Sequence, residues 1–158
     1  MITAHLPSGY ILGRGAQRYG VHPWLMGAAI LGAVLPDFDL LWFYFVDNRA
    51  VHHHLYWVHM PAFWLPIAVV TLLALHRWAP KYSPPARAFF AAIVMHILLD
   101  SIAGSIAWQW PFNNDLFQLV TVQPTHSHFL LSFLFHWTFS LELAIWAIAL
   151  YLFAKAKL

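Results

Sequence analysis

Hydrophobic residues gather in four long stretches that are separated by short polar or proline-containing segments. The stretches cover residues 24–46, 56–78, 87–110 and 129–153, and each is close to the ~20 residues that a helix needs to cross a bilayer. A shorter segment over residues 3–18 would extend roughly 24 Å as a helix, which is most of one hydrocarbon core. We therefore predict an all-α integral membrane helical bundle of about four long transmembrane helices, with a short N-terminal helix that forms a hairpin with the first span.

The composition supports a membrane protein and excludes several other classes. Apolar residues make up 61% of the chain and charged residues 9%, against roughly 25% charged residues in a typical soluble domain. Eight Lys and Arg against six Asp and Glu leave no strongly basic face, so we expect no nucleic-acid partner. The absence of cysteine excludes disulfides and thiolate zinc sites. We expect residues 1–158 to form a single transmembrane helical domain.

Basic residues predict the orientation of the bundle. With the spans placed as above, all Lys and Arg except Arg49 fall on one side of the membrane: Arg14, Arg18, Arg77, Lys81, Arg87, Lys155 and Lys157. Cytoplasmic loops carry an excess of Lys and Arg. We therefore expect this side to be cytoplasmic, with the loop around Arg49 and the loop over 111–128 on the outer side.

Ionisable side chains occur inside the apolar stretches, where their burial is costly and usually marks function. The chain has eleven histidines, and four of its acids lie in or beside apolar runs: Asp37, Asp39, Asp47 and Asp100. Counted at about 1.5 Å per residue from the plane of basic residues, four groups lie at roughly 13–20 Å: His5, Asp37, His96 and Asp100. His59 lies at roughly 27 Å by the same count. Segments far apart in sequence thus bring ionisable groups to the outer half of the membrane, where a shared cation would offset their burial.

Two short motifs have spacings that suit a metal site. In HILLD, His96 and Asp100 are four residues apart and share one helix face, although an interhelical hydrogen bond is an equally ordinary use of this pair. In LPDFD, Pro36 is expected to open the helix, so that Asp37 and Asp39 can both reach neighbouring cations. The alternative role for these two carboxylates is to cap the helix break.

A histidine pair precedes the second apolar stretch. His54 and His59 lie at a loop-to-helix junction that can turn both imidazoles inward. Imidazole and carboxylate without thiolate suit zinc, with manganese or iron as alternatives. Three further histidines are candidates for an additional role in the site: His53, which could replace His54, and His126 and His128 in the outer loop. Glu142, in the last stretch, is expected to make an interhelical contact.

Five motifs together resemble a known family. HLPSGY, LPDFD, HLYWVH, HILLD and WQWPF occur in the order found in bacterial membrane-bound metal-dependent hydrolases, a family that includes the LexA-regulated YdjM-like proteins. That family is distantly similar to zinc-dependent phospholipase C and the fungal zinc nucleases. The resemblance covers about residues 1–112 and implies seven metal ligands: His5, Asp37, Asp39, His54, His59, His96 and Asp100. Leu55, Tyr56 and Val58 stand where the family usually has Arg-Gly and Thr, so substrate contacts near this motif are expected to differ.

The resemblance and the motifs together predict a metal-dependent hydrolase with two or three zinc ions. Asp39 or Asp100 is the expected general base. Because the site lies in the outer half of a bacterial inner membrane, facing the periplasm, we expect an amphiphilic lipid or lipid-linked substrate, with a lipid phosphoester favoured by the resemblance. The alternatives are a lipid amide or ester hydrolase of the ceramidase type and a non-enzymatic membrane metal-binding protein.

Overall fold

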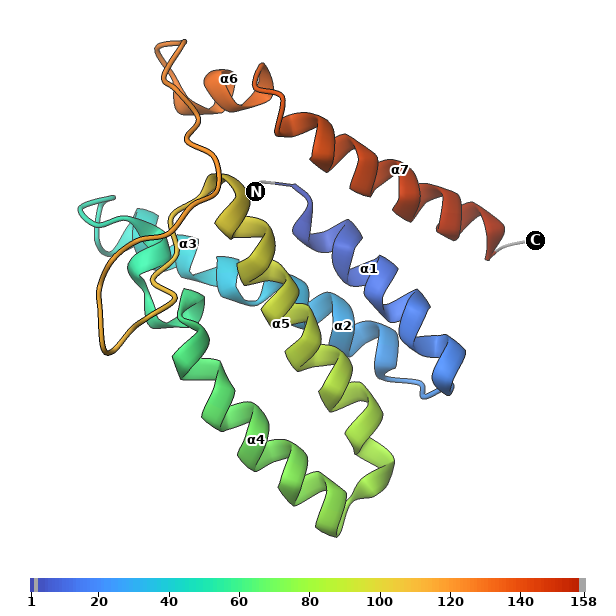
Figure 1. The fold of residues 1–158 in the computed structure, drawn as a ribbon. Coiled ribbons are helices and arrows are strands. Elements are labelled where there is room, and N and C mark those ends of the chain that lie inside the picture. The colour runs from blue at the N-terminus through green and yellow to red at the C-terminus, as the bar shows by residue number, and fades with distance from the viewer. Residues whose placement is uncertain (2, 157–158) are drawn as a thin grey trace.

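The computed structural model describes residue 1 and residues 3–156, and all the longer regular elements in this part of the chain are helices (Figure 1). An isolated antiparallel bridge pairs Ile106 with Phe117. The all-α prediction is therefore confirmed for the described residues. The α-helices are α1 (His5–Ala16), α2 (Leu25–Val34), α3 (Asp39–Phe45), α4 (Pro61–Trp78), α5 (Ser83–Ala103), α6 (Phe129–Leu134) and α7 (Phe139–Lys155).

Helices α1, α2 and α5 form the packed centre of the molecule. The predicted N-terminal helix is present, because α1 and the short 3₁₀ helix η1 (Gln17–Tyr19) cover most of the expected segment. Small residues let the helices approach closely, as is common where lipid surrounds a bundle. A side chain at Gly32 of α2 would collide with the backbone of Phe89 in α5. Ala29 and Ala88 are buried at the same contact. The backbones of α2 and α5 therefore pack closely against each other.

The helix break predicted at LPDFD is present. Helix α2 ends at Val34, the 3₁₀ helix η2 (Pro36–Phe38) follows, and α3 continues after a bend of 49°. Pro36 has no N–H to donate to the preceding turn, so the α-helical ladder changes to a tighter turn at this point. The bend places Asp37 in the 3₁₀ turn and Asp39 in the first turn of α3.

The number of candidate spans is lower than the sequence predicts. In the described chain, α4 and the segment Pro80–Ala103, which joins η5 (Pro80–Tyr82) to α5, are long and apolar enough to cross a membrane, and the bent pair α2–α3 would be a third span. The expected fourth span is divided into α6 and α7. Between them Thr138 N donates to His136 Nδ1 at 3.3 Å, a local side-chain bond of the kind that competes with helix continuation.

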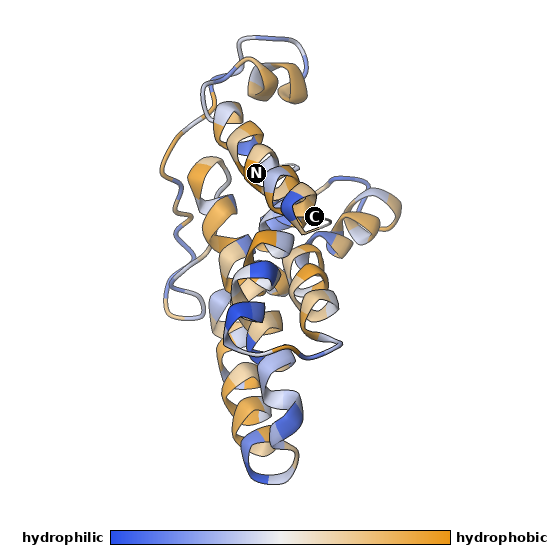
Figure 2. Cartoon of the chain, turned by 90° about the vertical axis from the view of Figure 1, so that its right-hand side faces the viewer, coloured by the Kyte–Doolittle hydropathy of each residue, from blue (hydrophilic) through white to orange (hydrophobic). Residues whose placement is uncertain are grey.

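The long helices consist largely of hydrophobic residues, which are orange in Figure 2, and many of these residues are exposed. No residue of α4 is buried, and Leu65, Val70 and Leu73 each expose about two thirds of their surface. Soluble monomers rarely expose contiguous apolar surface of this extent. The exposed surface is therefore that of a helical membrane protein, whose apolar faces lie against lipid.

Candidate metal centre

Two groups of potential metal ligands lie in contact with each other where α5 meets the α2–α3 bend. The first group joins the start of α1, the η2 turn and the last half of α5 through His5, Asp37, His96 and Asp100. One ligand atom from each of these residues lies within 4.8 Å of the others. Asp100 contacts both imidazoles, with Oδ1 at 3.1 Å from His5 Nε2 and Oδ2 at 3.0 Å from His96 Nε2.

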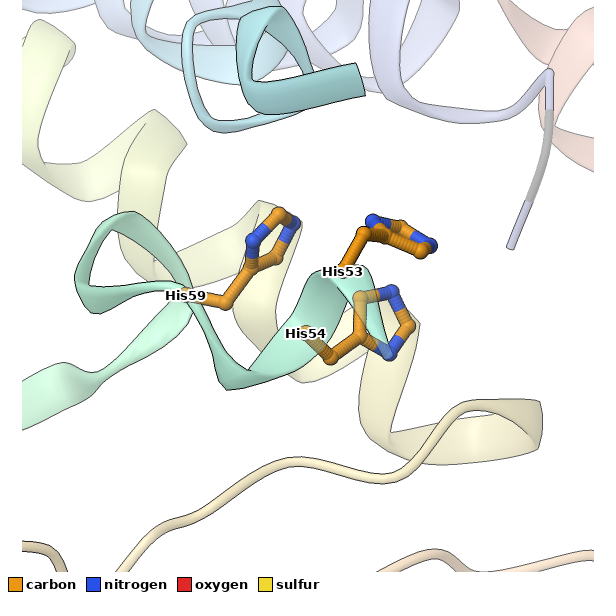
Figure 3. A group of neighbouring side chains, drawn as sticks. All are labelled: His53, His54 and His59. Carbon is orange, nitrogen blue, oxygen red and sulfur yellow. The ribbon is translucent and has the colours of Figure 1, made fainter. Parts of the chain in front are cut away.

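The second group consists of three imidazoles on adjacent 3₁₀ turns (Figure 3). His53 and His54 belong to η3 (His53–Leu55), and His59 ends η4 (Trp57–His59). One ring nitrogen from each of the three histidines lies within 4.8 Å of the other two. Asp39 lies beside them, with Oδ2 at 3.0 Å from His59 Nδ1 and Oδ1 at 3.8 Å from His53 Nδ1. This group can offer three imidazoles and a carboxylate from four positions.

Carboxylates and one imidazole pair join the two groups. Asp100 Oδ2 lies 3.7 Å from Nε2 of both His54 and His59. Asp37 Oδ1 lies 3.9 Å from His59 Nε2, and His59 Nε2 is 3.3 Å from His96 Nε2. Carboxylates placed between two clusters of nitrogen ligands are an arrangement that two-metal sites use.

The orientation of His96 is set by the end of α2. The backbone carbonyl of Ala33 can only accept, so His96 Nδ1 donates to it, at 2.7 Å. Neutral His96 then presents its unprotonated Nε2 to the cluster, which is the tautomer that can bind a metal. An imidazole held through its second nitrogen is typical of metal-ligating histidines. The close α2–α5 packing thus positions one ligand of the first group.

The buried polar atoms of the cluster fit a bound cation. Among the described residues, most of the buried side-chain nitrogen and oxygen atoms without a hydrogen-bond partner belong to this cluster: His5 Nδ1, both Asp39 oxygens, His53 Nδ1, His54 Nδ1, His59 Nδ1 and Asp100 Oδ2. Although His59 Nδ1 and Asp39 Oδ2 are close, they are not aligned as a hydrogen bond. Leaving such groups unpaired costs about 1–3 kcal/mol each. Cations bound among the nitrogens and carboxylates would offset part of that cost.

The electrostatics of η3 favour a neutral His54. Burial lowers the pKa of His54 to about 2, opposed by the Asp100 carboxylate and reinforced by neighbouring His53. A neutral imidazole is the form that coordinates metal. In the same structure the α-amino group of Met1 donates to Asp100 Oδ1 at 2.7 Å, so that this carboxylate already faces a positive charge.

Gly104 is a residue of the site that the sequence did not reveal. It is the C-cap of α5, and a side chain there would collide with the His54 ring, with a Cβ only 2.9 Å from Nδ1. Gly104 N donates to the Asp100 carbonyl at 2.6 Å. Gly104 lies inside the apolar stretch 87–110 that the sequence predicts to be one span, whereas α5 ends at Ala103. Nothing local in sequence indicates that an imidazole occupies the space beside this glycine.

The structure brings most of the predicted site residues together and leaves two of them outside the ligand groups. All seven residues named as ligands lie in or beside the two groups, and His53 joins them. His126 and His128 lie outside both groups. Thr125 Oγ1 lies 3.0 Å from His126 Nδ1, and His128 Nδ1 accepts from Leu130 N as the N-cap of α6. Metal binding by the gathered residues stays a prediction.

The fold and the site define a class of protein, namely a helical membrane protein with a buried cluster of histidines and aspartates. The chain matches the family model described as YdjM inner membrane protein over residues 1–157, and it therefore belongs to this family. The family name indicates an inner membrane protein. No curated protein and no solved structure matches the chain.

Proposed function

We propose that this protein is a membrane-embedded hydrolase that uses two zinc ions to cleave an amphiphilic substrate, most favourably a lipid phosphoester. The observation that carries the proposal is the contact between the two ligand groups, which places Asp37 and Asp100 between two sets of imidazoles. The preference for a phosphoester comes from the resemblance to metal-dependent hydrolases.

In this scheme the two cations have separate ligand sets. His5, Asp37, His96 and Asp100 would hold the first, and His53, His54 and His59 the second. Imidazole and carboxylate ligands without thiolate suit zinc, with manganese and iron as the alternatives. When bound, such cations supply Lewis-acid activation of water and of the scissile phosphoryl or carbonyl oxygen.

The chain itself supplies the base and the orientation of the ligands. Asp39 is the candidate general base, because it lies at the edge of the imidazole group, with its oxygens 3.0 Å from His59 Nδ1 and 3.8 Å from His53 Nδ1. Asp100 contacts His5 and His96 directly, so its role in the proposal is that of a ligand. A base within hydrogen-bond reach of an activated water is the usual requirement for such hydrolysis.

The distribution of basic residues favours a multi-pass chain with the proposed site in the outer half of the inner membrane. Substrates that reach a site at this depth need an apolar part, which favours phospholipids, polyprenyl phosphates and other lipid esters. A ceramidase-type hydrolase would release a free fatty acid from the same position, whereas a phosphoesterase would release a phosphorylated headgroup or phosphate. The identity of the released product therefore separates these two reactions.

The test combines elemental analysis with product analysis on detergent-purified protein. We expect about two zinc ions per chain, loss of at least one in His96→Ala, and loss of lipid hydrolysis in Asp37→Ala and after chelation, since each change removes a ligand or the metal. His76→Ala, at the far end of α4, is the matched control and should change neither the zinc content nor the lipid hydrolysis. Unaltered hydrolysis in Asp37→Ala would contradict the proposal.

A second candidate function is a metal-binding role without catalysis. The first group is nearly closed, because His5, His96 and Asp100 are each almost fully buried and only Asp37 is partly exposed. Closed ligand sets are typical of structural metal sites, whereas catalytic sites keep an open position. Stoichiometric zinc without turnover on phospholipids, lipid esters or lipid amides would favour this function.

A further inference from the structure

A cavity of about 550 Å³ connects the candidate metal centre to an apolar wall. On one side it is lined by Asp37 and by the consecutive histidines of the η3 segment, His52–His54. Its apolar wall is built by two short helices, α3 and α6, through six side chains: Leu40, Phe43, Tyr44, Phe129, Leu130 and Phe133. The wall adjoins the histidines, because the Phe43 ring lies 5.8 Å from the His53 ring. The polar ligands and the apolar wall therefore line the same partly open cavity.

The apolar wall is held in place by specific contacts of α6. Phe133 is only 1% exposed, although it belongs to a six-residue helix whose other large side chains are mostly exposed. His128 caps the start of this helix, and Ser132 Oγ accepts from His126 N at 3.0 Å. The two outer-loop histidines thus help to position α6 beside the cavity, although they lie outside the metal centre.

A further part of the cavity lining is polar and begins next to Gly104, which contacts the His54 ring. Ser105 Oγ donates to Gln118 Oε1 at 2.8 Å, and Gln118 Nε2 donates to Thr121 Oγ1 at 2.8 Å. These three residues all line the cavity. The space therefore offers hydrogen-bonding groups and metal ligands at one part and aromatic and aliphatic surface at another, which matches a molecule with a polar head and an apolar tail.

We propose that the wall formed by α3 and α6 binds the acyl chain of a lipid whose headgroup ester lies at Asp37 and His53. This inference rests on the proposed function and adds the part of the substrate that the apolar wall recognises. A water-soluble phosphoester would leave the aromatic wall uncovered, whereas an acyl chain would cover it and leave the ester beside the ligands. Helix α6 is then a specificity-determining element rather than part of a transmembrane span.

The test uses the absence of native cysteine to place one thiol on α6. Leu130 and Leu131 are adjacent and similarly exposed, at 45% and 42%, but of the two only Leu130 lines the cavity. The zinc-loaded full chain in detergent would carry Leu130→Cys or the matched control Leu131→Cys. The rate of alkylation by N-ethylmaleimide would be measured with a dioleoyl phosphonate, which has lipid tails and a phosphoryl group but no cleavable ester, and with the same phosphonate lacking tails.

The expected result is selective protection by the tailed analogue. At about ten times its Kd, it should slow alkylation in Leu130→Cys about tenfold, because only the unliganded fraction reacts. It should leave Leu131→Cys within about twofold of its own rate, and the tailless analogue should protect neither. Equal protection of both variants, or none of Leu130→Cys, would overturn the acyl-chain site.

Product analysis on the same preparations keeps the two proposals apart. Selective protection without release of phosphate, headgroup or fatty acid from dioleoyl phospholipids would leave the acyl-chain site standing and refute the hydrolase. Hydrolysis without selective protection would leave the hydrolase standing and refute the acyl-chain site.

Discussion

At the residue scale, the site depends on side chains that fit spaces left by small neighbours. His54 lies against Gly104, and His96 lies against the carbonyl of Ala33. The ligand types and their local spacing were predictable from HILLD, LPDFD and the His54–His59 pair. The role of Gly104 was not, because it depends on the approach of a segment fifty residues away in sequence.

Gly104→Ala should remove the second cation while leaving the first. The added methyl group would stand in the space of the His54 ring and displace that ligand, so the zinc content should fall by about one ion per chain. Gly27→Ala is the control, since a methyl group there meets only open space. Elemental analysis and the helical circular dichroism of both variants provide the measurement, and full zinc content in a folded Gly104→Ala protein would show that Gly104 does not position His54.

At the element scale, helix α7 is joined to the start of α1 by a buried carboxylate. Glu142 is fully buried and accepts from Thr3 N at 2.8 Å and Thr3 Oγ1 at 2.5 Å. Trp146 Nε1 donates to the same hydroxyl at 3.2 Å. The expected interhelical contact of Glu142 is thus present, and it holds the chain two residues before His5. We predict that Glu142 positions the first ligand group.

Glu142→Ala should weaken cation binding at the first group. Removing the carboxylate releases Thr3 and, with it, the restraint on His5, and loss of a supporting contact of this kind typically costs about ten- to hundredfold in metal affinity. Leu143→Ala, the next residue and 56% exposed, should have no such effect. Competition titration of zinc against a chromophoric chelator measures the difference. Equal zinc affinities in the two variants would show that Glu142 does not position the first ligand group.

The division of the last apolar stretch into α6 and α7 is the main difference between the predicted and observed elements. Hydropathy is continuous across 129–153, so the stretch is expected to be one span. The bonds between His136 and Thr138 interrupt the helix instead, and α6 turns toward the cavity. Hydropathy measures the affinity of side chains for lipid, and it carries little information about a local hydrogen bond that ends a helix.

At the scale of the whole molecule, the two ligand groups connect the start of α1, the α2–α3 bend, η3–η4 and α5. A cation shared by these segments would bind the folded chain and not the unfolded one, so it would stabilise the fold by about 2.7 kcal/mol at a hundred times its Kd. Binding of metal and folding of the bundle are therefore expected to be coupled.

Chelation should lower the thermal stability of the intact protein. We expect the unfolding midpoint in detergent to fall after treatment with EDTA and to recover when zinc is restored, because the cation stabilises only the folded state. His96→Ala should unfold at a lower temperature from the start and respond less to EDTA. Differential scanning fluorimetry on the nine tryptophans follows the transition, and a midpoint insensitive to both EDTA and zinc would argue against the shared cation.

The sequence by itself determined the class of the protein, the approximate positions of its longer helices, the break at Pro36 and the residue types of the site. These properties depend on neighbours along the chain, namely on the length of apolar runs, on helical periodicity and on the missing N–H of proline. Only the tertiary structure decided that His53 joins the cluster, that His126 and His128 support α6 instead, and that Glu142 holds Thr3. These contacts depend on how closely small residues let the helices approach, and no local pattern encodes that distance.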